Sequence, residues 1–306
     1  MTIPDFQTLM LPVLRASADG EVRIGEVVDR LSDDMALTDE ERLQLLPSGK
    51  QTTFSNRVNW AKSYLGKAGL VDLTRRAHFV ISEEGRKVLA NPPDRITIKY
   101  LEQFEAFRDF RAGSTETGGD EVVVSSTDGE GDILTPDEVM RQAHKEVQDA
   151  LADALLQRLR SGTPAFFEKV VVNLLIAMGY GGSNADISTA LVGKSGDGGV
   201  DGVIDQDPLG LDRIYVQAKR YADGNTVGSG AIRDFFGSLD DFKAAKGLFV
   251  TTSTFTTSAK GTASRLSKRI VLIDGKSLAK LMIRHNVGCR TVETLELKKE
   301  DDDFFE

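Results

Sequence analysis

Apolar and polar positions in the first hundred residues follow helical spacing and then strand spacing. Apolar residues from Phe6 to Leu14 line one helical face, and a second helix is expected around 24–31. Thr38 followed by Glu41 predicts a capping box at the start of a further short helix. Residues 53–68 repeat apolar positions as a helix does, whereas 70–74 and 78–81 read as two short strands.

A basic helix followed by a hairpin with arginines at its tip is typical of a winged helix-turn-helix domain. On the helix at 53–68, Arg57, Lys62 and Lys67 are expected to point outward, and Arg75 and Arg76 lie between the two strands. We therefore expect DNA binding through Arg57, Lys62, Arg75 and Arg76, with the helix in the major groove. The alternative is a small α+β domain whose charged face is only solvated. The aromatic residues are expected in the core: Phe54, Trp60, Tyr64 and Phe79.

The second half of the chain alternates between helical and strand patterns. A Thr-Pro-Asp-Glu run predicts a helix from 136 to about 160, whose apolar stripe is expected to pack on the protein's own second domain, with self-association as the alternative. The elements expected after it are a helix at 164–179, strands at 185–192, 200–204 and 213–219, a helix at 230–243, a strand at 247–252, a helix at 256–267, a strand at 270–273 and a helix from 277. This order predicts an α/β fold, a mixed sheet flanked by helices.

Composition adds domain boundaries to this pattern. Residues 112–140 carry eight acids and no base, and 112–134 are rich in Gly, Ser and Thr, as linkers are. The expected division is a winged-helix DNA-binding domain at 1–110, an acidic flexible linker at 111–134, a second domain with its leading helix at 135–297, and an acidic tail at 298–306.

The charge distribution and the scarcity of cysteine and histidine narrow the range of possible functions. The formal net charge is −9, yet residues 50–100 hold ten Lys and Arg against four Asp and Glu, which leaves a basic region for DNA. One cysteine and three scattered histidines exclude a disulfide framework and a zinc finger, so any metal is a hard cation on oxygen ligands. No apolar run approaches the ~18 residues of a spanning helix and no signal peptide is evident, so we expect a cytoplasmic protein with no membrane partner.

Two Gly-Lys-Ser triplets raise the question of a phosphate-binding loop. Such a loop needs a glycine five positions earlier, where this chain has Ser188 and Ile270. Neither triplet is therefore expected to bind a nucleotide.

A hairpin of the strands at 200–204 and 213–219 would bring three polar side chains together. Asp201 lies on the first strand, and alternation along the second places Gln217 and Lys219 on one face. A carboxylate, an amide oxygen and an ammonium at one end of a sheet are suited to holding a divalent metal and steering water toward a phosphodiester. Asp201 could instead bond local amides, and the two strand residues could face solvent.

Glu168 is a further candidate. It shares a side of its helix with Val171, Val172 and Leu175, so its carboxylate is expected to point at the sheet. It is either a direct or water-mediated metal ligand, or an acid that only accepts hydrogen bonds at the helix start.

The segments FFEKVVVNLLIAMGY, GKSGDGGVDG, LDRIYVQAKRY, KGLFVTTSTFT and IDGKSLAKLM resemble the catalytic domain of Mrr-type restriction endonucleases, a branch of the PD-(D/E)xK nuclease superfamily. The first hundred residues resemble that family's winged-helix domain. The resemblance implies a restriction-endonuclease-like fold and a catalytic set of Asp201, Gln217, Lys219 and Glu168. Of these, Asp201, Gln217 and Glu168 would hold Mg²⁺, and Gln217 stands where most of the superfamily has an acid.

The resemblance also implies the activity. We expect hydrolysis of phosphodiester bonds in double-stranded, methylated foreign DNA by a cytoplasmic restriction enzyme, which as a homo-oligomer could present two sites. The alternatives are a DNA repair or junction-cleaving nuclease, and a DNA-binding regulator whose nuclease site is inactive.

Overall fold

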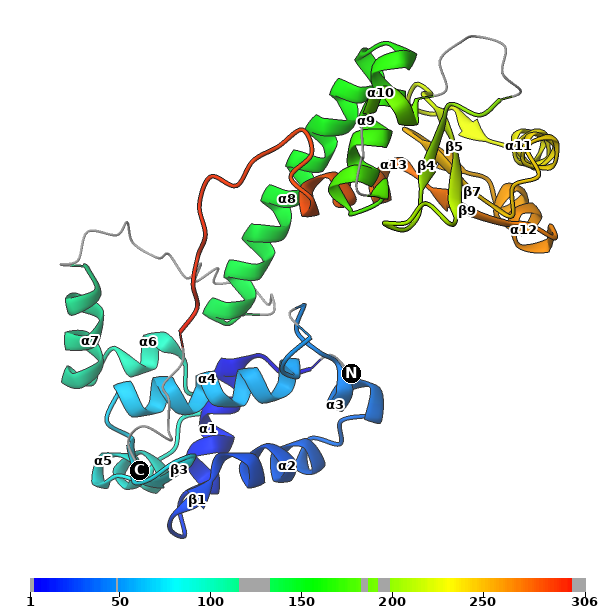
Figure 1. The fold of residues 1–306 in the computed structure, drawn as a ribbon. Helices are drawn as coiled ribbons and strands as arrows, with labels where there is room; N and C mark the ends of the chain where they lie inside the picture. The colour runs from blue at the N-terminus through cyan, green and yellow to red at the C-terminus, as the bar shows by residue number, and fades with distance from the viewer. Residues whose placement is uncertain (1–2, 48, 116–132, 183–186, 192–198, 299–306) are drawn as a thin grey trace. The chain divides into compact units, whose positions relative to one another are not determined.

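The computed structural model describes residues 3–47, 49–115, 133–182, 187–191 and 199–298. The chain divides into two compact units, Met1–His144 with Lys299–Glu306, and Lys145–Lys298 (Figure 1). The boundary falls inside one long helix, α8 (Pro136–Ser161). Most of the predicted linker and nearly all of the predicted acidic tail lie outside the described residues. Among the described residues, no helix has the length and apolarity needed to cross a bilayer.

The first unit combines short helices with a three-stranded antiparallel sheet of order β1-β3-β2. Its helices are α1 (Phe6–Ala16), α2 (Ile24–Asp34), α3 (Asp39–Leu43), α4 (Thr53–Lys67), α5 (Glu83–Ala90), α6 (Ile98–Leu101) and α7 (Glu105–Thr115). Its strands are β1 (Val22–Arg23), β2 (Val71–Leu73) and β3 (His78–Ile81). The predicted helices and hairpin are confirmed, while β1, which adds a strand to the hairpin, was not predicted. α7 runs through Thr115, inside the predicted linker.

The core of the first unit forms around α1, which is buried on nearly all sides and packs mainly against α4, while α4 also packs on β2. Phe54 and Phe79 are fully buried, and Trp60 and Tyr64 pack against the same cluster, which confirms their predicted place. The Thr38–Glu41 capping box is also present, with both reciprocal hydrogen bonds.

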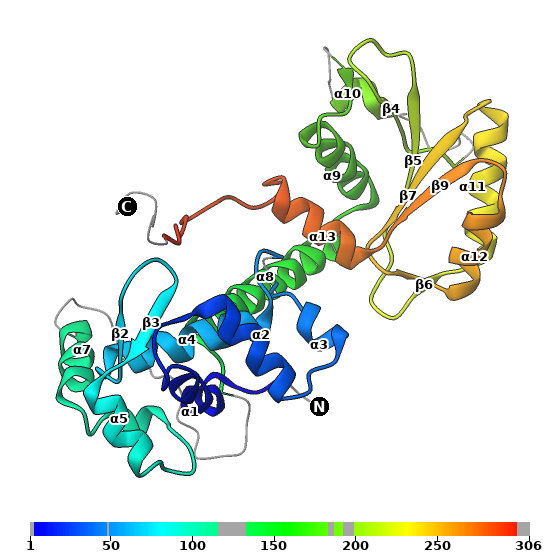
Figure 2. The same cartoon turned by 90° about the horizontal axis from the view of Figure 1, so that it is seen from below.

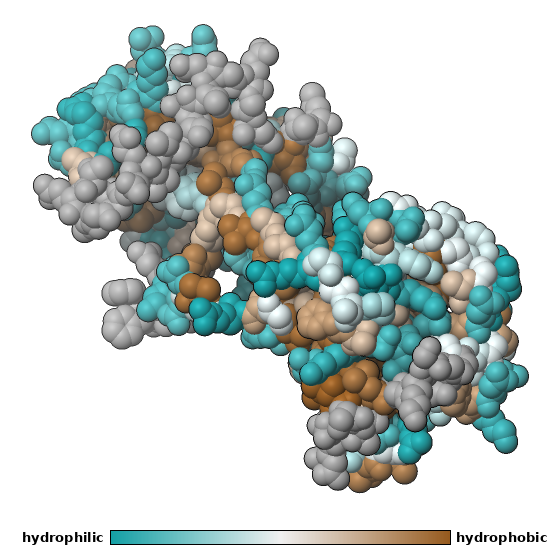
Figure 3. Space-filling view, turned by 90° about the horizontal axis from the view of Figure 1, so that it is seen from above, coloured by the Kyte–Doolittle hydropathy of each residue, from teal (hydrophilic) through white to brown (hydrophobic). Residues whose placement is uncertain are grey.

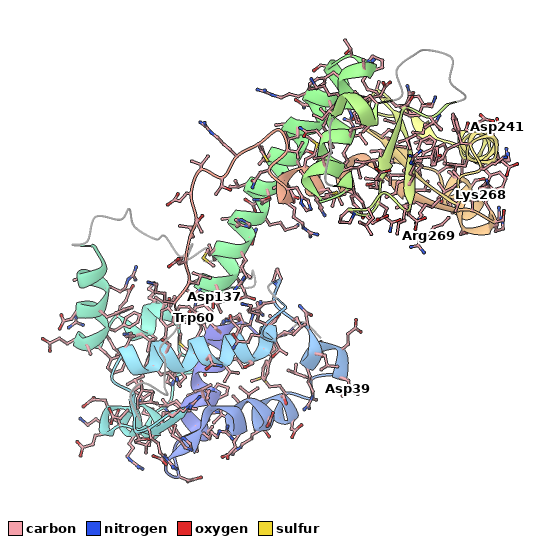
Figure 4. All side chains as sticks on the ribbon, in the orientation of Figure 1. Asp39, Trp60, Asp137, Asp241, Lys268 and Arg269 are labelled. Atoms are coloured by element: carbon pink, nitrogen blue, oxygen red, sulfur yellow. The ribbon has the colours of Figure 1, made fainter. Side chains whose placement is uncertain are left out.

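Arg57 does not point outward as predicted. Its side chain is 5 % exposed and forms an ion pair with Glu138 at 3.0 Å, while Nη1 donates to the carbonyl oxygen of Ile3 at 2.6 Å. Beside it, Asp137 accepts hydrogen bonds from Asn56 and Trp60, and Figure 4 shows Asp137 next to Trp60. The start of α8 therefore covers this side of α4, and Arg57 is a buried structural residue rather than a DNA contact.

Replacing Arg57 with methionine is expected to destabilise the first unit by about 3–5 kcal/mol, because Glu138 would keep a buried, unpaired charge. Chemical denaturation of the variant measures this change. Arg30→Met serves as the control, since its pair with Asp34 is more than half exposed on both sides and should matter little. A loss in Arg57→Met no larger than in the control would show that the pair does not hold α8 to α4.

The second unit is an α/β fold around a mixed four-stranded sheet of order β4-β5-β7-β9, as the pattern predicts. β4 runs antiparallel to β5, and the other neighbours are parallel. The strands are β4 (Gly202–Asp205), β5 (Arg213–Lys219), β7 (Lys246–Thr251) and β9 (Arg269–Ile273), with a separate pair of β6 (Thr226–Val227) and β8 (Thr254–Phe255). The helices after α8 are α9 (Pro164–Ala177), α10 (Ile187–Ala190), α11 (Ser229–Asp241), α12 (Thr257–Arg265) and α13 (Gly275–Arg284).

Helices cover both faces of this sheet (Figure 2). α9, α13 and the end of α8 pack on the face that carries Val216 and Ala218, and α11 and α12 pack on the face that carries Phe249. Polar residues cover most of the surface seen in Figure 3, with smaller apolar patches between them.

Two expectations for this unit need correction. The stretch at 185–192 is not a strand in its described part: Ile187–Ala190 is the short helix α10, and only Leu191 bridges to Gly202. The apolar stripe of α8 is buried only toward its end, at Leu155 and Leu159, whereas Val147 is 66 % exposed. The apolar stripe of α8 therefore packs against the second unit only near the end of the helix.

Candidate active site

The β4–β5 hairpin forms because its turn is held by one aspartate. The carboxylate of Asp207 accepts backbone N–H bonds from Leu209 at 2.9 Å and Asp212 at 3.0 Å, which lowers the pKa of Asp207. Gly210 turns the chain there with φ +69°, a conformation that favours glycine. The resulting register pairs Gly202 with Val216, so the next residues outward, Asp201 and Gln217, lie opposite each other.

Asp201 lies one residue before β4 and not on the strand as expected, at the mouth of the hairpin, where its carboxylate bonds to the neighbouring strand. Its Oδ2 accepts a hydrogen bond from the backbone N–H of Ala218 at 2.7 Å. Burial nevertheless raises the pKa of Asp201, and the Ala218 hydrogen bond and the Lys219 charge offset only part of that rise. The site therefore holds a carboxylate whose negative charge lacks full compensation.

Glu168 lies on the first half of α9, which Thr163 caps by accepting a hydrogen bond from the N–H of Phe166. Its side chain is partly buried. Burial raises the pKa of Glu168, and the negative charge of Asp201 raises it further. The structure thus brings the two predicted carboxylates into electrostatic contact, and a cation between them would relieve the repulsion.

Gln217 is buried, at 5 % exposure, in the middle of β5. Its Oε1 has no hydrogen-bond partner in the part of the chain that the structure describes. Gly199 lies against this amide, since a Cβ there would stand 3.1 Å from Nε2. An unpaired buried amide oxygen is costly unless a further group completes its bonding, and a cation would do so.

Lys219 is the last residue of β5, two positions beyond Gln217 on the same face. Its ammonium lowers the pKa of Asp201, so its positive charge lies near that carboxylate. Asp201 is thus coupled through charge to both Glu168 and Lys219, and Lys219 shares one face of β5 with Gln217.

The donor set fits a hard divalent cation. Within the described ranges, no three His, Cys, Asp or Glu side chains converge, so carboxylates alone would not enclose a metal. Two carboxylates with raised pKa values and the unpaired Oε1 of Gln217 supply oxygen ligands of the kind that Mg²⁺ takes.

The predicted DNA-binding residues other than Arg57 lie on the surface of the first unit. Lys62 is partly exposed on α4, and Arg75 and Arg76 are exposed in the β2–β3 turn. Arg75 pairs with Glu21 at 2.7 Å, in an ion pair of low burial. Arg75 and Arg76 are therefore neighbours in the β2–β3 turn, whereas Lys62 lies on α4.

A polar sector of α4 was not predicted, since its serines and asparagine carry no charge signal. With α1 packed on one side and the start of α8 on another, the partly exposed sector holds Ser55, Asn59, Lys62, Ser63 and Gly66. The Nδ2 of Asn59 donates to the carbonyl oxygen of Ser55 at 2.8 Å. Asparagine amides and serine hydroxyls are groups that hydrogen-bond base edges.

Comparison with known proteins identifies both units. Residues 159–282 match a family model for the Mrr catalytic domain, described as "Restriction endonuclease", and residues 6–91 match the Mrr N-terminal domain. The chain is 35 % identical over 311 residues, covering all of both chains, to the "Type IV methyl-directed restriction enzyme EcoKMrr" of Escherichia coli (strain K12).

Solved structures of restriction enzymes resemble the chain more distantly. The MspJI restriction endonuclease bound to a 27-mer oligonucleotide is 19 % identical with a TM-score of 0.36, over 69 % of this chain and 48 % of that one. The DNA modification-dependent restriction endonuclease AspBHI is 17 % identical with a TM-score of 0.37, over 72 % and 56 %. With both domain models matched in order and a full-length relative at this identity, the chain belongs to the Mrr family of restriction endonucleases.

Proposed function

We propose that this endonuclease uses Mg²⁺ to hydrolyse phosphodiester bonds of methylated, foreign double-stranded DNA in host restriction. The observation that carries the active-site assignment is the electrostatic coupling of Asp201 to Glu168 and to Lys219, beside a strand that also holds the buried, unpaired Oε1 of Gln217. Membership in the family implies a divalent cation, and the oxygen donors favour Mg²⁺.

Asp201, Gln217 and Glu168 would hold the cation. When bound, it supplies positive charge to the phosphate and makes a water molecule more acidic. Gln217 in place of an acid leaves the donor set one negative charge short, so affinity for the cation depends more on Glu168 and on phosphate oxygens of the DNA.

The chain's own residues perform the remaining steps. Lys219 would orient the attacking water and stabilise the negative charge that develops on the phosphate. Asp201 stays oriented for its task because the backbone of Ala218 holds one of its oxygens. The β4–β5 pairing sets these two groups beside each other, and a fixed relation between them is what positioning catalysis requires.

The first unit would grip the DNA. We infer that the polar sector of α4 with Asn59 at its centre faces base edges, while Lys62, Arg75 and Arg76 meet the phosphates. The ion pair of Arg75 with Glu21 is exposed enough to exchange for a phosphate at little cost. A homo-oligomer in the cytoplasm, with two catalytic units, would cut both strands.

Substituting Lys62 or Arg76 by glutamine should weaken DNA binding and reduce its salt dependence by about 0.9 in log–log slope for each lost phosphate contact. Fluorescence anisotropy over a range of salt concentrations measures this slope. Lys145→Gln on α8, whose lysine forms an exposed pair with Asp149, is the control and should leave the slope unchanged. Equal slopes in all variants would mean that another surface contacts the DNA.

Incubation of the purified protein and Mg²⁺ with a methylated plasmid, its unmethylated twin and a branched DNA tests the proposed substrate. Cutting confined to the methylated plasmid is expected. Equal cutting of all three would contradict modification dependence, and preference for the branched DNA would favour a repair or junction nuclease. Absence of cutting in every sample would favour a DNA-binding regulator.

A further inference from the structure

Three consecutive hydroxyl residues at the end of β7 have no part in the mechanism described so far. Thr251 and Thr252 are fully buried, and Ser253 is 5 % exposed. Burying a run of hydroxyls in a core is unfavourable unless each finds a specific partner. The hydroxyls of Thr251 and Thr252 find theirs at the end of β5 and just beyond it, whereas Ser253 donates to the carbonyl oxygen of Asn225.

Thr251 is paired with Lys219 in two ways. The two residues are opposite each other in the parallel β5–β7 register, at the last position of both strands. In addition, the hydroxyl of Thr251 donates to the carbonyl oxygen of Lys219 at 2.8 Å. The backbone of Lys219 therefore has a side-chain bond where the ladder ends.

Thr252 continues the attachment beyond the sheet. Its hydroxyl accepts a hydrogen bond from the N–H of Tyr221 at 2.9 Å and donates to the carbonyl oxygen of the same residue at 2.7 Å. One hydroxyl thus satisfies both backbone groups of Tyr221, two residues after β5 has ended. Threonine side chains therefore hydrogen-bond to the backbone at both ends of the segment from Lys219 to Tyr221.

Arg160, at the end of α8, adds hydrogen bonds that connect Thr252 and Arg220 to this helix. Its Nε and Nη2 donate to the carbonyl oxygen of Thr252 at 3.2 and 3.0 Å, and its own carbonyl oxygen accepts a hydrogen bond from Nη1 of Arg220. α13 packs closely on the same place, since a Cβ on Gly275 would stand 2.7 Å from the Thr252 oxygen. The glycine of the second Gly-Lys-Ser triplet therefore serves this close approach.

We propose that Thr251 and Thr252, with Arg160 behind them, are positioning residues for Lys219. The inference rests on the proposed role of Lys219 in DNA cleavage. Strand ends open more readily than strand centres, and Lys219 is a strand end whose long side chain must deliver its ammonium to one point. A displacement of about 1 Å at a catalytic group lowers the rate by roughly 10²-fold, so anchoring the Lys219 backbone acts directly on turnover.

Valine has nearly the shape of threonine but no hydroxyl, so Thr251→Val and Thr252→Val remove these hydrogen bonds with little change in volume. Each is expected to lower kcat for plasmid cleavage about tenfold or more, while the Kd for DNA stays within twofold. Thr251→Ser and Thr252→Ser, which restore the hydroxyl, should recover most of the activity. Thr262→Val, another buried threonine on α12, is the matched control and should cleave normally.

Arg160→Gln tests the same idea with both hydroxyls retained, and it serves if a valine variant fails to fold. A loss of kcat with unchanged Kd is again expected. The proposal is overturned if every folded variant cleaves at the wild-type rate, or if the serine variants are as slow as the valine variants. Lys219→Met is assayed beside them: full activity in that variant would reject the proposed site itself, whereas an inactive Lys219→Met with active valine variants would reject only the positioning role.

Discussion

Replacing Lys219 with methionine should lower the rate of DNA cleavage by roughly 10²–10³-fold and leave DNA binding nearly unchanged, as for loss of one preorganised group that stabilises transition-state charge. Methionine keeps the length and the apolar stem of lysine, so β5 should still form. The ammonium matters because it is the positive charge of the site that lies near Asp201. Single-turnover cleavage and anisotropy with the same duplex separate the two effects.

Lys246→Met is the matched control, because Lys246 lies at the opposite end of the same sheet and pairs with Asp212 there. It should cleave at the wild-type rate. A Lys219→Met protein that cleaves as fast as this control would remove Lys219 from the mechanism. A parallel loss of DNA affinity would instead place Lys219 in substrate binding.

Replacing Asp201 with asparagine should stabilise the cation-free protein at neutral pH while abolishing its response to Mg²⁺. The folded-state pKa values of Asp201 and Glu168 are raised, so ionising them costs folding free energy. Wild-type stability is accordingly lost as pH rises through these pKa values, and asparagine removes part of that loss. Asparagine also retains an oxygen that can accept the N–H of Ala218.

Thermal melting with and without Mg²⁺ measures both the stability of the cation-free protein and its stabilisation by Mg²⁺. Cation at 100 times its Kd should stabilise the wild-type protein by about 2.7 kcal/mol and Asp201→Asn by much less. Asp205→Asn, at the far end of β4 in an exposed pair with Arg213, is the control and should respond as the wild type does. Equal Mg²⁺ responses in wild type and Asp201→Asn would place the cation elsewhere.

The hairpin of the proposed active site could be predicted from the sequence because its signals are local. Strand alternation placed Gln217 and Lys219 on one face, and the hairpin expected from the strands at 200–204 and 213–219 brings Asp201 opposite Gln217. Helical spacing likewise oriented Glu168 toward the sheet, and its electrostatic contact with Asp201 agrees with that orientation. These features depend on neighbours within one element or one turn.

The position of the Arg57 side chain was predicted wrongly because it depends on a distant part of the chain. Its partner Glu138 lies 81 residues away, and no periodicity within α4 indicates that the start of α8 will cover it. Burial of Gln217 and the contacts of Thr251 and Thr252 with the end of β5 also depend on tertiary packing. The stretch near 187–190 formed α10 instead of a strand, since only Leu191 finds a strand neighbour.

The most direct test of the proposed active site is the rate of methylated-plasmid cleavage as a function of Mg²⁺ concentration, measured for the wild-type protein and Asp201→Asn after chelation of all divalent cations. The wild type should be inactive without cation and gain activity with a saturable Mg²⁺ dependence, and Asp201→Asn should remain inactive at every concentration. Cleavage by the chelated wild type, or a Mg²⁺-dependent rate in Asp201→Asn equal to the wild-type rate, would contradict the assignment of this site.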